Sequence, residues 1–330
     1  MPDSDEIALA VGLLRQGGVV AFPTETVYGL GADALNPAAV QRIFTIKGRP
    51  QHHPLIVHLA DVSQLAEWAR DIPPDAYALA EHFWPGPLTL ILKRAARVPD
   101  SVTGGQDTIG LRVPNHPVAL ALLRQFAGGI AAPSANRFGR ISPTRKEHVS
   151  AELGDAVDLI LEGGPCSVGL ESTIVNLTSA TPAILRPGHI SAAALAEVLG
   201  KPVTGHGSAE PAGPRASGML ESHYAPRTPL RLIPTQQLLQ EVSALLAFAR
   251  RVAVLELERT PSKVPYLERG VYHYIMPNTP EEYARRLYAT LREADAQGCD
   301  FLFVEQPPED EAWSAINDRL RRAANAHKAA

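Results

Sequence analysis

The sequence predicts an α/β protein with two domains. Its 330 residues exceed what a single hydrophobic core usually organises. From residue 229 onward, strand-like and helix-like segments alternate, which is typical of a parallel, doubly wound sheet. Before residue 200, short apolar strands end one after another in glycine, serine, threonine or arginine. We therefore expect a larger domain with one concave polar pocket, followed by a smaller Rossmann-like parallel α/β domain.

Composition narrows the classes of function. The formal net charge of −4 gives no support to nucleic-acid binding driven by overall charge, so an anion site must be a local cluster. Cys166 and Cys299 lie far apart and in no CxxC pattern, which indicates neither a disulfide framework nor a zinc site. An acidic N-terminus and the lack of a long apolar run predict a cytoplasmic protein with no membrane span.

The first polar strand end follows an N-terminal helix. Residues 6–16 are expected to be helical and to end at a glycine pair, and residues 19–22 read as a buried strand. The strand runs into residues 23–31, PTETVYGLG, which bring two hydroxyls, a carboxylate and a phenol before two glycines. Alone, this segment is as readily a threonine-rich turn as a ligand-binding loop.

Two cations one residue apart follow the next helix, which is predicted for residues 37–46. Lys47 and Arg49 offer a point charge and a planar fork of donors, both suited to a phosphorylated ligand. Taken alone, two such cations more often belong to a solvated basic turn than to a binding site. His58 lies in the buried strand predicted for residues 55–59, where a histidine is more often a core residue than a catalytic one.

Further strands end on polar side chains. Strands are expected at residues 88–92 and 108–113, and Arg112 in the second must find an anionic or carbonyl partner. Small residues lead to Ser134 and Asn136, and the basic loop at residues 137–146 would alone be a surface segment. Strands ending at Gly163 and at Arg186 repeat the pattern, and this uniformity indicates one concave polar pocket.

The remaining chain divides into a linker and a second domain. We expect a catalytic domain at residues 1–200, a linker at residues 201–228 and an α/β domain at residues 229–330. His223 and Tyr224 stand together on the linker, in a segment suited to docking. The second domain has no GxGxxG or Walker motif, so nothing indicates that it binds a nucleotide.

Together these segments resemble the YrdC/Sua5 family of L-threonylcarbamoyladenylate synthases, in its longer two-domain form. The resemblance covers nearly the whole chain and implies a twisted mixed sheet with a concave polar cavity in the first domain. The family makes threonylcarbamoyl-AMP from L-threonine, bicarbonate and ATP and releases pyrophosphate, as the first step of the t6A modification of tRNA. The motifs that carry the resemblance are residues 23–31, 47–50, 54–55, 84–89, 112–114, 133–136, 171–174, 186–188, 223–226 and 317–320.

The resemblance implies roles for matching residues. Lys47 and Arg49 are the expected catalytic residues, which would hold the triphosphate and the bicarbonate-derived anion. Tyr224 would fold over the nucleotide as a gate. Mg²⁺ would arrive with ATP, and no metal held by the protein alone is expected. The implied ATP-binding residues are Lys47, Arg49, His53, Thr108, Ser134, Asn136, Ser142, Arg186 and Tyr224, and the implied threonine-binding residues are Thr24 or Thr26, His58, Arg112, Ala132 and Ser172.

The resemblance also implies partners. The product would pass to a tRNA threonylcarbamoyl transferase complex, and direct tRNA binding would not be required. Two departures from the family pattern are His53, where a small polar residue such as asparagine is frequent, and residues 216–219, where a proline often precedes the glycine.

Two other functions compete with the synthase. A module that binds double-stranded RNA or the ribosome could use the same basic concave surface, but the net charge and the lack of aromatic residues beside the arginines disfavour it. A carbamoyl transferase of the hydrogenase-maturation type carries a similar module, but it needs zinc-finger cysteines and an acylphosphatase segment, which this sequence lacks.

Overall fold

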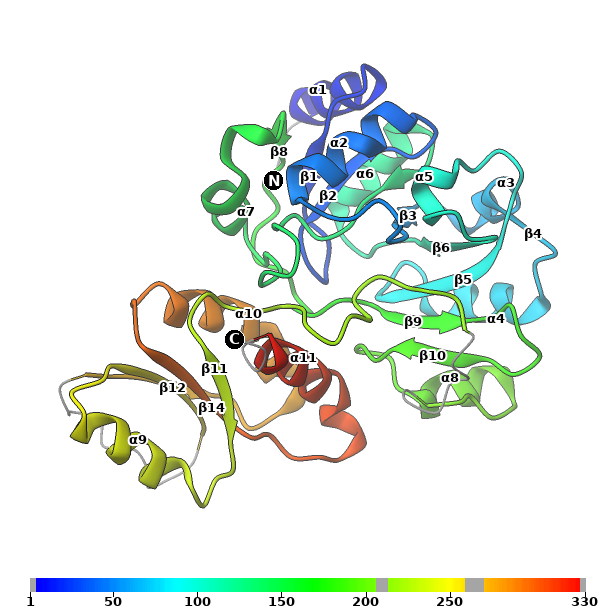
Figure 1. The fold of residues 1–330 in the computed structure, drawn as a ribbon. Helices are drawn as coiled ribbons and strands as arrows, with labels where there is room; N and C mark the ends of the chain where they lie inside the picture. Colours follow the sequence, from blue (N-terminus) through cyan, green and yellow to red (C-terminus); the bar gives the residue numbers. More distant parts are fainter. Residues whose placement is uncertain (1–3, 206–212, 259–269, 327–330) are drawn as a thin grey trace. The chain divides into compact units, whose positions relative to one another are not determined.

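The computed structural model describes residues 4–205, 213–258 and 270–326. They form two compact units (Figure 1), one of residues 1–138 and 142–219 and one of residues 139–141 and 220–330. The predicted linker is thus divided, because residues 213–219 belong to the first unit and residues 220–228 to the second. Residues 206–212 of that linker lie outside the described residues.

The first unit is built on a mixed sheet, as the resemblance implied. Its strands are β1 (Val20–Phe22), β2 (Gly29–Asp33), β3 (Ile56–His58), β4 (Ala69–Arg70), β5 (Leu88–Arg94), β6 (Thr108–Arg112), β7 (Ile130–Ala131), β8 (Leu159–Ile160), β9 (Thr173–Asn176) and β10 (Ala183–Arg186). They are ordered β10-β9-β5-β6-β3-β7-β2-β1-β8, and β4 pairs with β5. Parallel and antiparallel pairs both occur, so the sheet is mixed.

Helices of the first unit begin at recognisable signals. Asn36 caps one by accepting hydrogen bonds from the backbone of Ala38 and Ala39, and Ser191 caps another. Pro117 stands at the first position of a third, where its missing N–H costs nothing. The helices are α1 (Ser4–Arg15), α2 (Pro37–Lys47), α3 (Leu65–Trp68), α4 (Pro74–Phe83), α5 (Asp100–Thr103), α6 (Pro117–Phe126), α7 (Lys146–Leu153) and α8 (Ala192–Leu199). Only α1 and α2 were predicted from the sequence.

The two faces of this sheet have different covers, because successive strand residues point to opposite faces. Val57, Leu111 and Val175 lie in the larger hydrophobic cluster, which α2, α4 and α8 complete. Phe22 and Ile130 lie in a second cluster, which α1 and α6 complete. The apolar faces of these helices are thereby buried on the sheet.

One part of the sheet is covered differently. Ile56, Ile91 and Ile174, from three different strands, form a small cluster with Leu185 and Ala216. This cluster draws no residue from any helix that the structure describes. Ala216 belongs instead to the chain that leads out of the first unit. Among the described residues, this stretch of the sheet is therefore covered by an extended segment and by no helix.

The prediction of a glycine-rich loop after the first strand is wrong in part, because residues 29–33 form strand β2. This strand pairs with β1 on one side and β7 on the other. A Cβ atom on Gly31 would lie 2.7 Å from the ring of Phe22 and 2.8 Å from a methyl group of Ile130. Gly31 is therefore a packing requirement inside a strand, where its lack of a side chain lets the ring approach.

The second unit has the expected parallel α/β architecture. Its strands are β11 (Leu230–Ile233), β12 (Val252–Leu257), β13 (Val271–Met276) and β14 (Phe301–Glu305), ordered β11-β14-β12-β13 with every pair parallel. Its helices are α9 (Leu238–Ala247), α10 (Pro280–Asp295) and α11 (Ser314–Asn325). Leu238 and Val242 of α9 pack on Val252, Val254 and Phe303, so this helix covers one face. The parallel pairing of these strands agrees with the predicted architecture.

The two cysteines do not form a disulfide with each other. Cys166 and Cys299 are both free and buried. Across residues 4–205, 213–258 and 270–326, no helix combines the length and the apolar character that crossing a bilayer demands.

Candidate functional site

Three predicted site residues share one face of the first sheet, the face that α1 and α6 cover where it carries Phe22 and Ile130. In β6, Thr108 and Arg112 alternate with Ile109 and Leu111, which lie in the larger core. His58 in β3 is the register partner of Arg112. The two-residue period of the strands therefore directs Thr108, Arg112 and His58 to the same face.

Lys47 is fixed at the end of α2, where Gly48 adopts a left-handed conformation with φ 63°. Its Nζ donates to the backbone carbonyls of Ser134 and Asn136, both at 2.5 Å. Burial lowers the pKa of the Lys47 ammonium well below its usual range, and nearby Arg49 lowers it further. Lys47, Ser134 and Asn136, far apart in sequence, are thus brought together as the prediction required.

Arg49 and Arg186 meet at one residue, Ser217. The Nη2 atom of Arg49 donates to Ser217 Oγ at 3.2 Å and to the carbonyl of Pro54 at 2.9 Å. The Nη1 atom of Arg186 donates to the carbonyl of Ser217 at 3.0 Å, while Nε and Nη2 hold the carbonyl of Ser172. Two buried guanidinium groups thus converge on oxygen atoms of one residue, an arrangement that suits an anion equally well.

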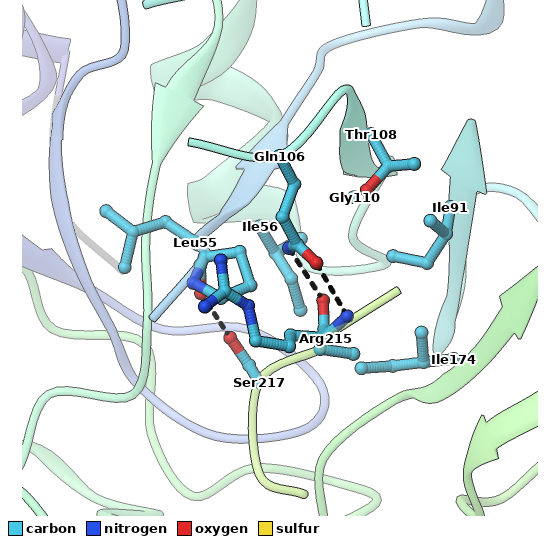
Figure 2. A pocket seen from close by; sticks show the side chains of 11 residues that line it. Leu55, Ile56, Ile91, Gln106, Thr108, Gly110, Ile174, Arg215 and Ser217 are labelled. Carbon is cyan, nitrogen blue, oxygen red and sulfur yellow. Dashed lines mark hydrogen bonds between the residues drawn. The ribbon is translucent and has the colours of Figure 1, made fainter. Parts of the chain in front are cut away.

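Ser217 belongs to a short extended segment, residues 215–217, that we call the strap. Figure 2 shows the pocket in which it lies. The Gln106 side chain donates to the carbonyl of Arg215 at 3.1 Å and accepts from its N–H at 2.7 Å. Ser217 Oγ donates to the carbonyl of Pro54 at 2.8 Å. The pocket is lined by Pro54, Leu55, Ile56, Ile91, Gln106, Thr108, Gly110, Ile174 and the strap.

Hydroxyl groups surround the guanidinium of Arg186. Ser172 Oγ lies 2.7 Å from Thr89 Oγ1 and accepts from Arg186 at 3.1 Å. Next to it, Ser142 donates to a carboxylate oxygen of Glu171 at 2.6 Å. The side chains of Thr89, Ser142, Glu171 and Ser172 are almost completely buried, as is Arg186. The site is therefore dry, and its polar groups hydrogen-bond to one another.

Arg112 has a partner that the sequence analysis did not name. Its Nη2 lies 2.7 Å from Oε2 of Glu25, and its Nε donates to the carbonyl of Gly86 at 3.2 Å. Beside it, burial and then Arg112 lower the pKa of His58 to about 3. His58 is therefore neutral at pH 7, and its ring meets that of Phe22 edge to face at 5.9 Å between centroids.

The two candidate threonines play different roles. Thr24 Oγ1 donates to the carbonyl of Val27 at 2.7 Å and lies 2.8 Å from the hydroxyl oxygen of Thr26. Thr24 also accepts from the N–H of Val27 at 3.2 Å. Thr24 therefore shapes its own turn, as the turn interpretation predicted, and this turn positions the hydroxyl of Thr26.

His53 and Ala132 flank the site. The His53 ring lies 5.4 Å from the ring of Phe138, and Arg49 lies 5.9 Å from the same ring centroid. Burial, and next Arg49, lower the pKa of His53 to about 4. Ala132 follows β7 and donates its N–H to the carbonyl of Ile56 at 2.9 Å. His53 is therefore an uncharged neighbour of Arg49 at pH 7.

Tyr224 is placed in the second unit, where it is 1% exposed. It has a positive φ of 62°, and its ring stacks on that of Tyr288 with centroids 5.9 Å apart. Arg319 lies 5.2 Å from the ring centroid of Tyr224, and His223 packs against its edge. The residue predicted as a nucleotide gate is thus packed among side chains of its own unit.

The sequence analysis missed Glu25, Thr89, Gln106, Glu171 and Ser217. Glu25, Thr89 and Glu171 lie inside motifs that carried the family resemblance, so their residue types were visible but their partners were not. Gln106 and Ser217 gave no local signal. Their partners lie 109 and up to 168 residues away, and only the folded chain brings them together.

Residues 12–188 match the family model of Sua5, YciO and YrdC, which is described as "Telomere recombination". The chain belongs to the Sua5/YciO/YrdC family. Residues 190–325 match a second model, described as "Threonylcarbamoyl-AMP synthase, C-terminal domain". Both parts of the longer, two-domain form of the family are therefore present.

Similar proteins carry consistent names. The chain is 39% identical to the threonylcarbamoyl-AMP synthase of Pyrococcus abyssi over 328 residues, covering 96% of this chain and 94% of that one. It is 41% identical to the Bacillus subtilis protein of that name over 332 residues, covering 97% and 93%. The crystal structure of P. abyssi Sua5 with L-threonine superposes with a TM-score of 0.89 at 37% identity, covering 98% of this chain and 96% of that one.

Proposed function

We propose that this Sua5/YciO/YrdC family protein makes L-threonylcarbamoyl-AMP from L-threonine, bicarbonate and ATP and releases pyrophosphate. Relatives that span nearly the whole chain bear the name of this enzyme, a nucleotidyltransferase. A relative whose structure matches 98% of this chain was crystallised with L-threonine. The single observation that supports it most is the convergence of Arg49 and Arg186 on one site, next to buried Lys47.

The proposed roles follow the chemistry of each group. Lys47 and Arg49 hold the triphosphate and the bicarbonate-derived anion. Further contacts to ATP come from His53, Thr108, Ser134, Asn136, Ser142, Arg186 and Tyr224. Threonine is held by Thr26, with Thr24 shaping the turn beside it, and by His58, Arg112, Ala132 and Ser172.

Electrostatics explains why so many cations are buried together. ATP, bicarbonate and the carboxylate of threonine are all anions and repel one another in water. Fixed cations in a dry site offset that repulsion without having to reorganise during the reaction. Lys47, Arg49, Arg112 and Arg186 are each 8% exposed or less, which keeps their fields strong.

Positioning accounts for much of the remaining catalysis. The amine of threonine must attack a carbon atom, and a carbamate oxygen must then attack the α-phosphorus. Alignment of bound reactants can lower such barriers by about 7–11 kcal/mol. The carbamate is labile in water, so a covered site is required. The strap supplies that cover at the stretch of sheet that no described helix covers.

Magnesium would enter with ATP. Mg²⁺ prefers hard oxygen donors and usually reaches proteins through one or two carboxylates plus substrate phosphates. The Glu171 carboxylate and the Ser142 hydroxyl, 2.6 Å apart and buried, are donors of that kind and would hold it. The ion would neutralise phosphate charge and make pyrophosphate a better leaving group.

The product defines the downstream partners. An acyl-adenylate is an activated compound, which a tRNA threonylcarbamoyl transferase complex would consume in t6A modification. Such a role places the protein in the cytoplasm. Direct tRNA binding is not required for this reaction, and no observation favours the alternative of an RNA-binding module.

The test is a mixture of purified protein, ATP, Mg²⁺, bicarbonate and each amino acid in turn, analysed by mass spectrometry. We expect threonylcarbamoyl-AMP and one equivalent of pyrophosphate only when threonine and bicarbonate are both present. Turnover that ignores either compound, or a product with no threonine, would contradict the proposed function.

A further inference from the structure

Glu25 has no role in the function proposed above, although it forms the closest ion pair in the site. Its carboxylate lies 2.7 Å from the Arg112 guanidinium, and both side chains are 5% exposed. The pair is close but poorly oriented. Neither oxygen of Glu25 nor Nη2 of Arg112 has a well-aligned hydrogen bond to a residue that the structure describes.

A third side chain in the same place also has a polar atom without a well-aligned partner. Nδ1 of His58, the register partner of Arg112, has no hydrogen-bond partner among the described residues. Buried polar groups in proteins almost always have such partners. A buried ion pair contributes little to stability unless its remaining donors and acceptors are satisfied. Three side chains at neighbouring strand ends therefore keep hydrogen-bonding atoms that suit a polar ligand.

The backbone that carries these two side chains is held in place on both sides of the ion pair. The carbonyl of Glu25 accepts from the N–H of Val168 at 2.7 Å. The carbonyl of Arg112 accepts from the N–H of Leu59 at 2.9 Å, and its Nε is held by Gly86. Both charged groups are therefore anchored, and their free hydrogen-bonding positions are preorganised for something else.

We propose that Glu25 binds the ammonium group of the amino-acid substrate while Arg112 binds its carboxylate. This inference rests on the proposed function and adds a residue to it. A zwitterionic α-amino acid brings one charge of each sign, so one ion pair is exchanged for two and no buried charge loses its partner. His58 is neutral and adds no competing charge.

The proposal makes a selective prediction about ligands. A compound that lacks either charge would separate Glu25 from Arg112 and leave one of them buried without a partner. Because that penalty is large, both charges of the substrate should be required for binding. A purely structural ion pair would show no such dependence on the ligand.

The test measures binding to the full-length protein by titration calorimetry. Its ligands are L-threonine, threoninol, which lacks the carboxylate, and the hydroxy acid in which a hydroxyl replaces the amine of threonine. The variants are Glu25→Gln and Glu67→Gln. Glu67 is a matched control, since it pairs with Arg97 at 3.2 Å but is 54% exposed.

We expect the unmodified protein to bind threonine at least about tenfold more tightly than either analogue, as the loss of a charged hydrogen bond implies. Glu25→Gln should weaken threonine binding about tenfold or more and leave the hydroxy acid unaffected or bound more tightly. Glu67→Gln should change neither.

Three results would overturn the inference. One is equal affinity of the unmodified protein for threonine and the hydroxy acid, which needs no variant that might misfold. Another is an equal loss of both ligands in Glu25→Gln, which indicates a structural role. The third is unchanged threonine binding in Glu25→Gln. If threonylcarbamoyl-AMP still forms in the unmodified protein, the proposed function survives any of these.

Discussion

Lys47 and His58 show how burial changes what a residue contributes. Both lie at strand or helix ends of the first unit, and burial is the main cause of the lowered pKa of each. Lys47 keeps strong acceptors, the carbonyls of Ser134 and Asn136, whereas His58 has an unsatisfied nitrogen. Lys47 is thus held by two carbonyl acceptors, whereas His58 is neutral at pH 7.

Removal of the Lys47 ammonium should stop the reaction. In Lys47→Ala we expect threonine- and bicarbonate-dependent pyrophosphate release to fall by about 10²–10³-fold, because a fixed charge beside the phosphates is lost. Lys93→Ala is the control, since Lys93 is 44% exposed and pairs with Asp71 on the surface. Undiminished turnover in Lys47→Ala would refute its assignment as a catalytic residue.

Neutral His58 predicts a pH dependence of stability. The folded-state pKa of His58, about 3, lies below the unfolded value near 6.5, so only the unfolded chain takes up this proton between those values. The free energy of unfolding therefore receives the full contribution above pH 6.5 and loses it as the pH falls. By pH 5 the loss from His58 should be about 2 kcal/mol.

Chemical denaturation at pH 7 and pH 5 would measure this effect. His58→Gln removes the titration, so its loss of stability between the two pH values should be smaller by about 2 kcal/mol. Identical losses in both proteins would mean that His58 is protonated in the folded state.

At the scale of elements, two extended segments, strand β2 and the strap, shape the sheet face that carries the site. Strand β2 passes beneath the Phe22 ring, and this requires glycine at position 31. The strap lies in the pocket of Figure 2 and is held by Gln106 and by the two arginines of the site. Neither segment has a period that a sequence pattern could reveal, yet each completes the sheet face that carries the site.

A matched pair of glycine substitutions tests the strand assignment. Gly31→Ala should lower the free energy of unfolding by about 1–3 kcal/mol, because the new methyl group overlaps Phe22 and Ile130. Gly12→Ala should instead raise it by about 0.5–1 kcal/mol, since Gly12 lies in α1 with no atom within 4 Å of the added carbon. Thermal or urea unfolding would measure both, and equal effects would contradict the packing role of Gly31.

Release of the strap should expose a cleavage site. In Gln106→Ala, two hydrogen bonds to Arg215 are lost, so trypsin should cut after Arg215 about tenfold faster. Intact-mass analysis identifies the fragments, and Gln125→Ala, an exposed change on α6, is the control. If both variants are cut at the same rate, Gln106 does not hold the strap.

At the scale of the whole molecule, the chain divides into units with separate cores. The first contains two large hydrophobic clusters and the second contains its own. The boundary at residue 219 leaves the strap with the first unit. Because the core clusters of the first unit do not depend on residues of the second, the first unit should fold without it.

Truncation of the chain tests whether the first unit folds by itself and whether the residues after it contribute to activity. A chain that ends at residue 205 should retain cooperative unfolding but lose about 10²-fold in threonylcarbamoyl-AMP formation, because its site is uncovered and poorly aligned. Circular dichroism and product mass would measure the two properties. A chain that ends at residue 219 shows how much the strap alone restores. Full activity of the chain that ends at residue 205 would show that the residues after it are not needed to cover the site.

The sequence by itself determined the architecture and indicated most of the residues of the candidate site. The period of two in the strands, the alternation in residues 229–330 and the family motifs all arise from neighbours in the chain, so they could be read without a structure. Lys47, Arg49, Arg112 and Arg186 were recognised in this way. The strand β2 was misread because its glycines are typical of a turn.

Only the tertiary structure decided which side chains are partners. Glu25 meets Arg112, Gln106 meets Arg215 and Arg49 meets Ser217 across large separations in sequence. These pairs depend on strand register and on the path of the exit segment, and both are set by the packing of the whole unit. A local pattern can show that a charge will be buried, but the fold alone chooses its counterpart.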